Sequence, residues 1–235
     1  MAVIRDRRFA LIYRCAAFLL AIAGILDTIG LWSGDLKPSY FMYYTIDSNV
    51  LMVALFGLLI IKTARALREQ GPKGPCGFYP VLGMIVGIDI FLTLVGYWVI
   101  LAPLQFTMNG ESSLYSFSNL TVHLIAPLLG FLDFVLFSKS KSLRYKHIYL
   151  VVIFPLLYVA FTSIAGLLGY VFVSPFDNSI RTRFAYFFID FDQIGLMVFA
   201  YIGALAVFFL IFSHLLYLFD SKVTLFNRGK DEGQK

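Results

Sequence analysis

The chain alternates long apolar segments with short polar ones. Six apolar runs of about 20 residues follow one another. A helix of that length crosses the hydrocarbon core of a bilayer, which is about 30 Å thick. The two-residue alternation of barrel strands is not sustained in these runs. The pattern predicts six transmembrane helices in one domain over 1–235, at approximately 9–30, 40–61, 78–101, 115–137, 148–173 and 194–219.

Composition supports this interpretation. The chain is 60% hydrophobic and only 14% charged, which lies outside the range of soluble globular domains. We therefore expect an all-α, multi-pass integral membrane protein, located in the cell membrane if the source is prokaryotic. We expect its outer surface to contact membrane lipid.

Lysine and arginine predict the orientation, because short cytoplasmic loops carry an excess of them. Sixteen of the 19 basic residues fall near the N-terminus, near the C-terminus or in the second and fourth connections, on one side of the membrane. Lys37, Arg181 and Arg183 remain for the other side. This split predicts that both termini are cytoplasmic. The same split explains the excess of basic residues, so no nucleic-acid partner is predicted.

Polar side chains gather on one face of two predicted helices. Such residues cost several kcal/mol in hydrocarbon and normally face the interior of a bundle. Spacings of three and four residues place the members of each set on one stripe. In the segment YYTIDSNVLM the stripe comprises Thr45, Ser48, Asn49 and Met52, and in 115–137 it comprises Ser116, Asn119, His123 and Pro127.

Depth brings one residue from each stripe together. Both helices enter from the outer side, and a rise of 1.5 Å per residue places Thr45 roughly 8 Å deep and His123 roughly 12 Å deep. A threonine hydroxyl becomes a nucleophile when a neighbouring base takes its proton, and histidine suits that task near neutral pH. The pair is chemically sufficient for acyl transfer. Against this, a membrane threonine often only bonds the carbonyl four residues earlier.

Other polar residues are candidates to support this pair. The amide of Asn49, with Ser48 and Asn119, is a candidate to stabilise an oxyanion. Asp190 or Asp192, from the connection before the last helix, is a candidate to orient His123. Interhelical hydrogen bonding is the alternative role for the serine and asparagine residues.

A pocket is expected farther along the bundle. Asp89, Thr93 and Tyr97 share a stripe, and Tyr158 is a further candidate to line it. An interhelical hydrogen bond is the commonest role of a buried carboxylate such as Asp89. No metal and no other cofactor is predicted, because one membrane histidine without neighbouring cysteines or paired carboxylates does not make a zinc site. Bis-histidine haem ligation is not expected either, because His214 lies near the opposite end of the bundle.

Three stretches together carry a family resemblance: YYTIDSNVLM, NLTVHLIAPLLGFLDFVLF and YFFIDFDQIG. The chain resembles the androgen-induced and ADTRP-like six-helix membrane proteins and their prokaryotic relatives. Eukaryotic members are threonine hydrolases that cleave fatty acid esters of hydroxy fatty acids (FAHFA). The resemblance implies that Thr45 is the nucleophile and His123 its partner. Asp47 departs from the family pattern, where tryptophan or glutamine often stands.

The sequence thus predicts an intramembrane lipid-ester hydrolase that acts on fatty acid esters of hydroxy fatty acids or similar acyl esters. The main alternative is a non-catalytic lipid-binding or transport protein that uses the same polar pocket for a head group, because binding and hydrolysis require similar pockets. The sequence gives no indication of protein partners.

Overall fold

The computed structural model describes residues 4–109, 114–138, 142–173 and 181–231. The protein is an all-α bundle, and six helical segments are long and apolar enough to cross a membrane. The first half comprises α1 (Arg7–Thr28), the 3-10 turn η1 (Pro38–Met42), α2 (Tyr44–Gln70), α3 (Pro80–Gly96), the π-helical turn η2 (Tyr97–Leu101) and α4 (Ala102–Asn109). The second half comprises α5 (Phe117–Leu120), the π-helical turn η4 (Thr121–Ile125), α6 (Ala126–Phe137), η5 (Tyr145–Val152), α7 (Ile153–Leu167), β1 (Phe172–Val173), β2 (Arg181–Thr182), η6 (Phe187–Ile189), α8 (Phe191–Ile194) and α9 (Met197–Asp231).

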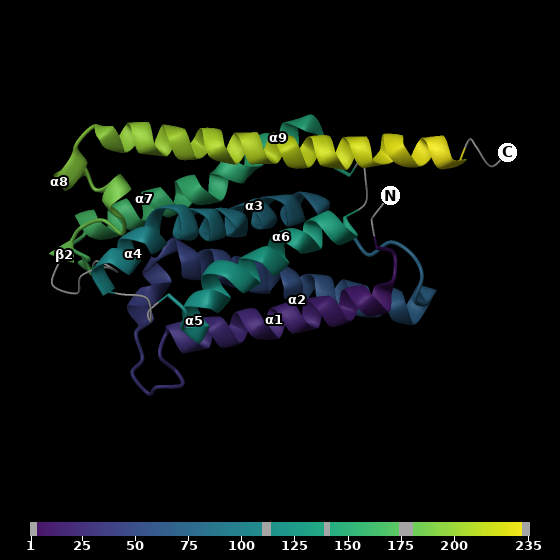
Figure 1. Ribbon diagram of the computed structural model, residues 1–235, viewed down its shortest axis with the longest axis horizontal. Coiled ribbons are helices and arrows are strands. Elements are labelled where there is room, and N and C mark those ends of the chain that lie inside the picture. Colours follow the sequence, from purple (N-terminus) through teal and green to yellow (C-terminus); the bar gives the residue numbers. More distant parts are fainter. Residues whose placement is uncertain (1–3, 110–113, 139–141, 174–180, 232–235) are drawn as a thin grey trace.

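The six spans run alternately up and down, so the start of α1 and the end of α9 lie at the same end of the bundle (Figure 1). In this view α9 and α1 lie along opposite edges. α1 packs against α2, α2 against α3, and α3 against α6, whereas α9 packs chiefly on η5, η6 and α3. The prediction of a six-helix membrane bundle is confirmed.

Helix bounds differ from the prediction by several residues at some ends. α2 begins at Tyr44 because Pro38 starts a separate 3-10 turn and Tyr43 is extended, with φ −110° and ψ 138°. It then continues to Gln70, well beyond the predicted end. α7 ends at Leu167, and Gly169 with φ +97° turns the chain into the short β1–β2 hairpin. Hydropathy detects the membrane segment, whereas caps and turns set the helix ends.

Two of the basic residues assigned to the cytoplasmic flank are buried. Asp6 caps α1 by accepting two backbone N–H groups of its first turn at 3.0 and 3.2 Å. Arg7, the next residue, points its guanidinium into the α2–α3 connection and donates to the carbonyls of Gly71 and Lys73 at 2.8 and 2.9 Å. Arg14 lies inside the bundle, 1% exposed. These arginines therefore stabilise the fold, in addition to biasing the charge.

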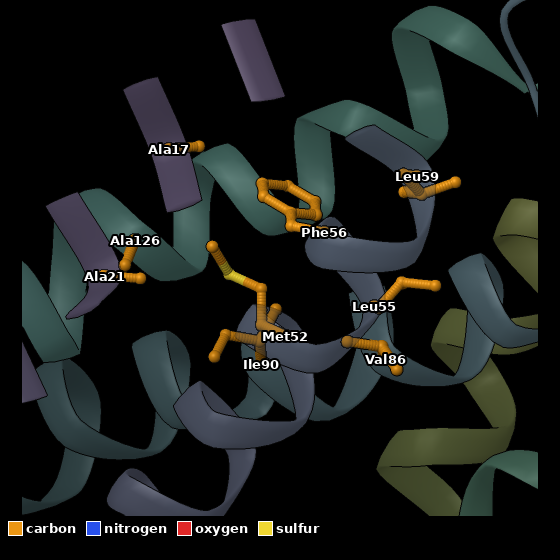
Figure 2. Close-up of a cluster of buried hydrophobic side chains, with 9 residues drawn as sticks. All are labelled: Ala17, Ala21, Met52, Leu55, Phe56, Leu59, Val86, Ile90 and Ala126. Atoms are coloured by element: carbon orange, nitrogen blue, oxygen red, sulfur yellow. The ribbon is translucent and has the colours of Figure 1, made fainter. Parts of the chain in front are cut away.

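Small residues allow close helix packing in the half formed by α1, α2, α3 and α6. Ala17, Ala21 and Ala126 pack against Met52 and Phe56 in the cluster shown in Figure 2. Small side chains let membrane helices approach closely. Because lipid is as apolar as the side chains, van der Waals contact, not the hydrophobic effect, holds such helices together.

The helices of the other half bury fewer of their side chains. In the most apolar window of each span, 44% of residues are buried in α3 and in α5–α6, but only 22% in η5–α7 and 17% in α9. α7 and α9 therefore turn most of their side chains outward. They also enclose the cavity described below.

Candidate active site

Thr45 lies in the first turn of α2. The extended Tyr43 ends η1, so that Tyr44 and Thr45 are the first two residues of the new helix. The predicted polar stripe follows below, and Ser48, Asn49 and Met52 are fully buried. Thr45 itself is partly exposed and stands at the edge of this buried stripe. It is therefore shallower in its helix than predicted, because α2 starts later.

His123 lies in a π-helical turn. In η4 the N–H of Ala126 bonds the carbonyl five residues earlier, that of Thr121. A second π-helical turn, η2, supplies Tyr97, whose ring stacks on the imidazole with centroids 3.7 Å apart and planes at 20°. Trp98 of the same turn donates its indole N–H to the His123 carbonyl at 3.2 Å. Single π-helical turns often occur at functional sites because they re-aim side chains.

The structure brings Thr45 and His123 together. Thr45 Oγ1 lies 3.2 Å from His123 Nε2, and His123 Nδ1 lies 3.2 Å from the backbone carbonyl of Asn119. A carbonyl only accepts, so Nδ1 carries the hydrogen and, in the neutral ring, Nε2 offers a lone pair. The Thr45 hydroxyl then donates to Nε2. This is the tautomer and the direction that a general base requires.

The amide expected to stabilise an oxyanion is already engaged. Both hydrogens of Asn49 Nδ2 are donated, to the carbonyls of Thr45 at 2.7 Å and Val122 at 3.0 Å. The structure therefore does not support Asn49 as an oxyanion donor. Its amide instead ties the turn that carries Thr45 to the turn that carries His123.

Ser48 and Asn119, which were also expected to stabilise an oxyanion, form other hydrogen bonds. Ser48 Oγ lies 3.0 Å from the Thr45 carbonyl and 2.7 Å from Thr93 Oγ1. The amide of Asn119 donates to the Leu114 carbonyl at 2.8 Å, so its contribution to His123 comes from its backbone carbonyl. Both residues support the pair by fixing its backbone.

The expectation that Asp190 or Asp192 orients His123 is wrong. Asp190 caps α8 and accepts a 2.6 Å hydrogen bond from Thr182 Oγ1. Asp192 forms an exposed ion pair with Arg183 at 2.5 Å. The position that a carboxylate would occupy beside His123 Nδ1 is taken by the Asn119 carbonyl.

A cavity of about 160 Å³ opens beside Thr45. Its lining is almost entirely apolar or aromatic and comes from α2, α3, η2, η5, α7, η6 and α9. Thr93, Tyr97 and Tyr158 line it as predicted, whereas Asp89 does not and instead accepts a hydrogen bond from the Tyr44 hydroxyl at 3.4 Å. Thr45 thus contacts His123 and also lines an apolar cavity.

Two residues of the site were not found from the sequence. Trp98 braces the His123 backbone, and Tyr186, from the connection before η6, lines the cavity next to Thr45. Both lie far from Thr45 in the chain. Aromatic residues are abundant in all six spans and connections, so neither stood out.

The fold and the site together define a multi-pass membrane protein with a threonine–histidine pair beside an apolar cavity. Comparison with family models, with curated proteins and with solved structures finds no match to this chain. The family resemblance carried by its motifs therefore stays a prediction. Among the described residues, no group of three or more histidine, cysteine, aspartate or glutamate side chains is placed to hold a metal ion.

Proposed function

We propose that the protein is an intramembrane lipid-ester hydrolase with Thr45 as nucleophile and His123 as general base. One observation carries this proposal: Thr45 Oγ1 lies 3.2 Å from a His123 ring nitrogen whose partner nitrogen is fixed by a backbone carbonyl. A threonine that serves only helix packing often bonds the carbonyl of its own preceding turn. This threonine, at the start of α2, bonds a base from another helix.

The reaction has two halves. His123 Nε2 takes the Thr45 proton while Oγ1 attacks the ester carbonyl, and the proton then passes to the departing alcohol oxygen. An acyl-threonine remains. Water gives its proton to the same nitrogen, attacks the acyl carbonyl, and releases the acid as Thr45 regains its proton.

The cavity supports an acyl substrate. Its volume is close to that of an engineered protein cavity, about 150 Å³, that stays dry and binds benzene, so it holds a segment of about six carbons of an acyl chain. It extends along α9 from Tyr201 to Phe209, a rise of about 12 Å. A slender, apolar chain fits this shape better than a polar head group does. Fatty acid esters of hydroxy fatty acids, or similar acyl esters, are the proposed substrates.

Lipid enters from the side. Leu156 of α7 and Tyr201 of α9 line the cavity yet are 48% and 42% exposed on the outer face of the bundle. An ester dissolved in the bilayer therefore reaches Thr45 without crossing bulk water.

The proposed orientation places both termini in the cytoplasm and the site in the outer half of the membrane, which is the cell membrane if the source is prokaryotic. It rests on the uneven distribution of lysine and arginine. Cysteines introduced at exposed Ser39 and exposed Glu69 lie at opposite ends of α2. An impermeant maleimide added to intact cells should label only Ser39→Cys. Labelling of Glu69→Cys alone would reverse the orientation.

Covalent labelling tests the hydrolase. A fluorophosphonate probe incubated with the purified protein should modify Thr45, and Thr45→Val, which keeps the side-chain shape, should not react. Modification at another residue, or none in a folded protein that still binds a non-hydrolysable ether lipid, would favour the lipid-binding alternative instead.

A further inference from the structure

An ester hydrolase needs a donor for the negative charge that develops on the carbonyl oxygen. Losing one such donor typically lowers kcat by about 10²–10³-fold. The amide of Asn49 is fully used by two carbonyls. The Ser48 hydroxyl is held between Thr93 and the Thr45 carbonyl. The donor must therefore come from another part of the cavity wall.

Tyr186 brings a hydroxyl to the place where it is needed. The Tyr186 ring lies against the Tyr158 ring, with centroids 6.3 Å apart, and its hydroxyl is close enough to the side chains of Thr45 and Tyr158 and to the backbone N–H of Tyr44 for them to affect the pKa of the phenol. All four residues line the cavity. The oxygen that develops charge will be bonded to the carbon that Thr45 Oγ1 attacks, so a donor beside Oγ1 is within reach of it.

The hydroxyl hydrogens of the residues around Tyr186 are already engaged. Tyr158 donates its only hydroxyl hydrogen to the Met42 carbonyl at 3.0 Å. Thr45 donates its hydrogen to His123 Nε2, and the N–H of Tyr44 has no lone pair to offer. The oxygens of Thr45 and Tyr158 are therefore the acceptors available to Tyr186.

The ring of Tyr186 is held in place. It stacks on Phe188 with centroids 5.1 Å apart and planes at 7°, and it meets Tyr43 edge-on at 6.0 Å. The connection that carries it is closed by the Thr182–Asp190 hydrogen bond. A rigid donor stabilises charge without the cost of reorganisation at the moment of reaction.

We infer that Tyr186 is a further catalytic residue, whose hydroxyl, held by the N–H of Tyr44 at the start of α2, stabilises the oxyanion of the ester. This inference rests on the proposed hydrolase function. As Thr45 Oγ1 bonds the carbonyl carbon, the π electrons of the C=O bond move to oxygen, and Tyr186 donates a hydrogen bond to it without losing its proton. The C=O bond re-forms when the alcohol departs. The positive end of the α2 dipole favours the same charge.

The protonation state of Tyr186 is consistent with this role. Burial in the cavity wall raises the pKa of its phenol above the ordinary value. The phenol therefore keeps its hydrogen throughout the neutral pH range and remains a donor.

Removal of the hydroxyl tests the inference. Tyr186→Phe keeps the stacked ring, so with p-nitrophenyl hexanoate in detergent micelles we expect kcat to fall by about 10²–10³-fold while KM stays near its wild-type value. Tyr43→Phe is the matched control, because Tyr43 is a neighbouring ring whose hydroxyl donates away from the site, to the Val173 carbonyl at 2.6 Å. Its kcat should equal that of the wild type.

A transition-state analogue separates catalysis from packing. A trifluoromethyl ketone adds to Thr45 as an oxyanion, so Tyr186→Phe should bind it about 10²-fold more weakly. Binding of a non-hydrolysable ether lipid should be unchanged. If the phenylalanine variant does not fold, 3-fluorotyrosine at position 186 keeps the ring and is a stronger donor, and it should tighten the ketone complex. Unchanged ketone affinity in the folded variant overturns the role.

The outcomes distinguish this inference from the proposed function. Wild-type kcat in Tyr186→Phe, with an inactive Thr45→Val, overturns the role of Tyr186 and leaves the hydrolase standing. Wild-type activity in Thr45→Val overturns both. A fall in kcat that comes with weaker ether-lipid binding and a lower Tm in Tyr186→Phe shows a packing role and also overturns the inference.

Discussion

Two buried polar clusters lie at opposite ends of the bundle, and they are built differently. The cluster near the two chain ends contains opposite charges. Arg14 donates to both carboxylate oxygens of Asp133, at 2.7 and 3.1 Å, and to Thr63 Oγ1 and the Cys76 carbonyl, at 2.6 and 3.0 Å. Its guanidinium also lies over the Phe137 ring, 5.1 Å from the centroid. Four helices or connections are joined by one side chain.

The cluster at the other end consists of Thr45, His123 and their neighbours, and it is left incomplete. Among the described residues, Asn49 Oδ1 and Asp89 Oδ2 are buried without a hydrogen-bond partner. Thr45 and His123 meet at a single 3.2 Å contact, and a cavity lies beside them.

This difference separates stability from reactivity. A buried charge must be paired and hydrogen-bonded. Once all its hydrogen bonds are made, no donor or acceptor is left to bind a substrate. The Arg14–Asp133 pair is paired and hydrogen-bonded in this way. The Thr45 cluster tolerates unpaired acceptors and an adjoining cavity, features that reduce stability and that are expected where a substrate must bind and react.

The largest expected effect is on catalysis. Thr45→Val should lower kcat/KM for an ester substrate by at least about 10⁴-fold, because the proposed nucleophile is absent. His123→Ala should do the same, and the double variant should be hardly worse, because both residues serve one chemical step. Thermal unfolding of all three should stay near the wild type. Thr45→Ser, which keeps the hydroxyl, is the control that should retain activity, and an active Thr45→Val would remove the contrast between the clusters.

The next effect concerns stability. Arg14→Met should destabilise the protein by about 3–5 kcal/mol, because Asp133 is left buried and unpaired. Unfolding in mixed detergent micelles measures this. The fraction that stays folded should hydrolyse ester at the wild-type rate, since the cluster lies at the other end of the bundle. A fully stable Arg14→Met protein would show that the pair is not needed for the fold.

Replacing both charges sharpens this point. Arg14→Met combined with Asp133→Leu should be more stable than Arg14→Met alone, by at least about 3–5 kcal/mol, because no unpaired charge remains and apolar replacement of the whole pair costs little. The same unfolding experiment gives the coupling energy. A double variant as unstable as the sum of the two single variants would mean that the residues act independently.

A smaller effect is expected at Asp190, which organises the connection that carries Tyr186. Asp190→Ala removes the cap of α8 and the Thr182 hydrogen bond, at a cost of about 0.5–2 kcal/mol. Because Tyr186 loses its support, kcat should fall while the fluorophosphonate still labels Thr45. Thr182→Ala is the matched variant, since it removes the hydrogen bond and leaves the cap. Loss of labelling in Asp190→Ala would mean that the aspartate acts on the nucleophile itself.

The smallest effect is expected from the exposed Arg183–Asp192 pair. The Arg183 hydrogen bond lowers the pKa of Asp192 below its ordinary value. A lowered pKa in the folded state means that the pair stabilises above the unfolded pKa of about 4 and that this contribution is lost as pH falls through the folded value. The Tm of Asp192→Asn should therefore lie slightly below wild type at neutral pH and converge with it in acid. A constant difference across pH would exclude a charge effect.

Particular residues show how much of the site the sequence contained. Helical spacing predicted the buried stripe of Ser48, Asn49 and Met52, because a period of 3.6 residues follows from local geometry. Depth in the membrane also brought Thr45 and His123 to the same level. The orientation of His123 by the Asn119 carbonyl was not predictable, because it depends on a π-helical turn that hydropathy does not reveal.

The sequence by itself determined that six helices span a membrane and that one hydroxyl and one imidazole face inward at similar depth. These properties depend on the number, period and polarity of residues along single segments. Only the tertiary structure decided which donors are already engaged, why Asp190 acts on its own connection and not on His123, and how Tyr186 reaches Thr45. Those outcomes depend on hydrogen bonds between residues far apart in the chain, each with few lone pairs and hydrogens to share.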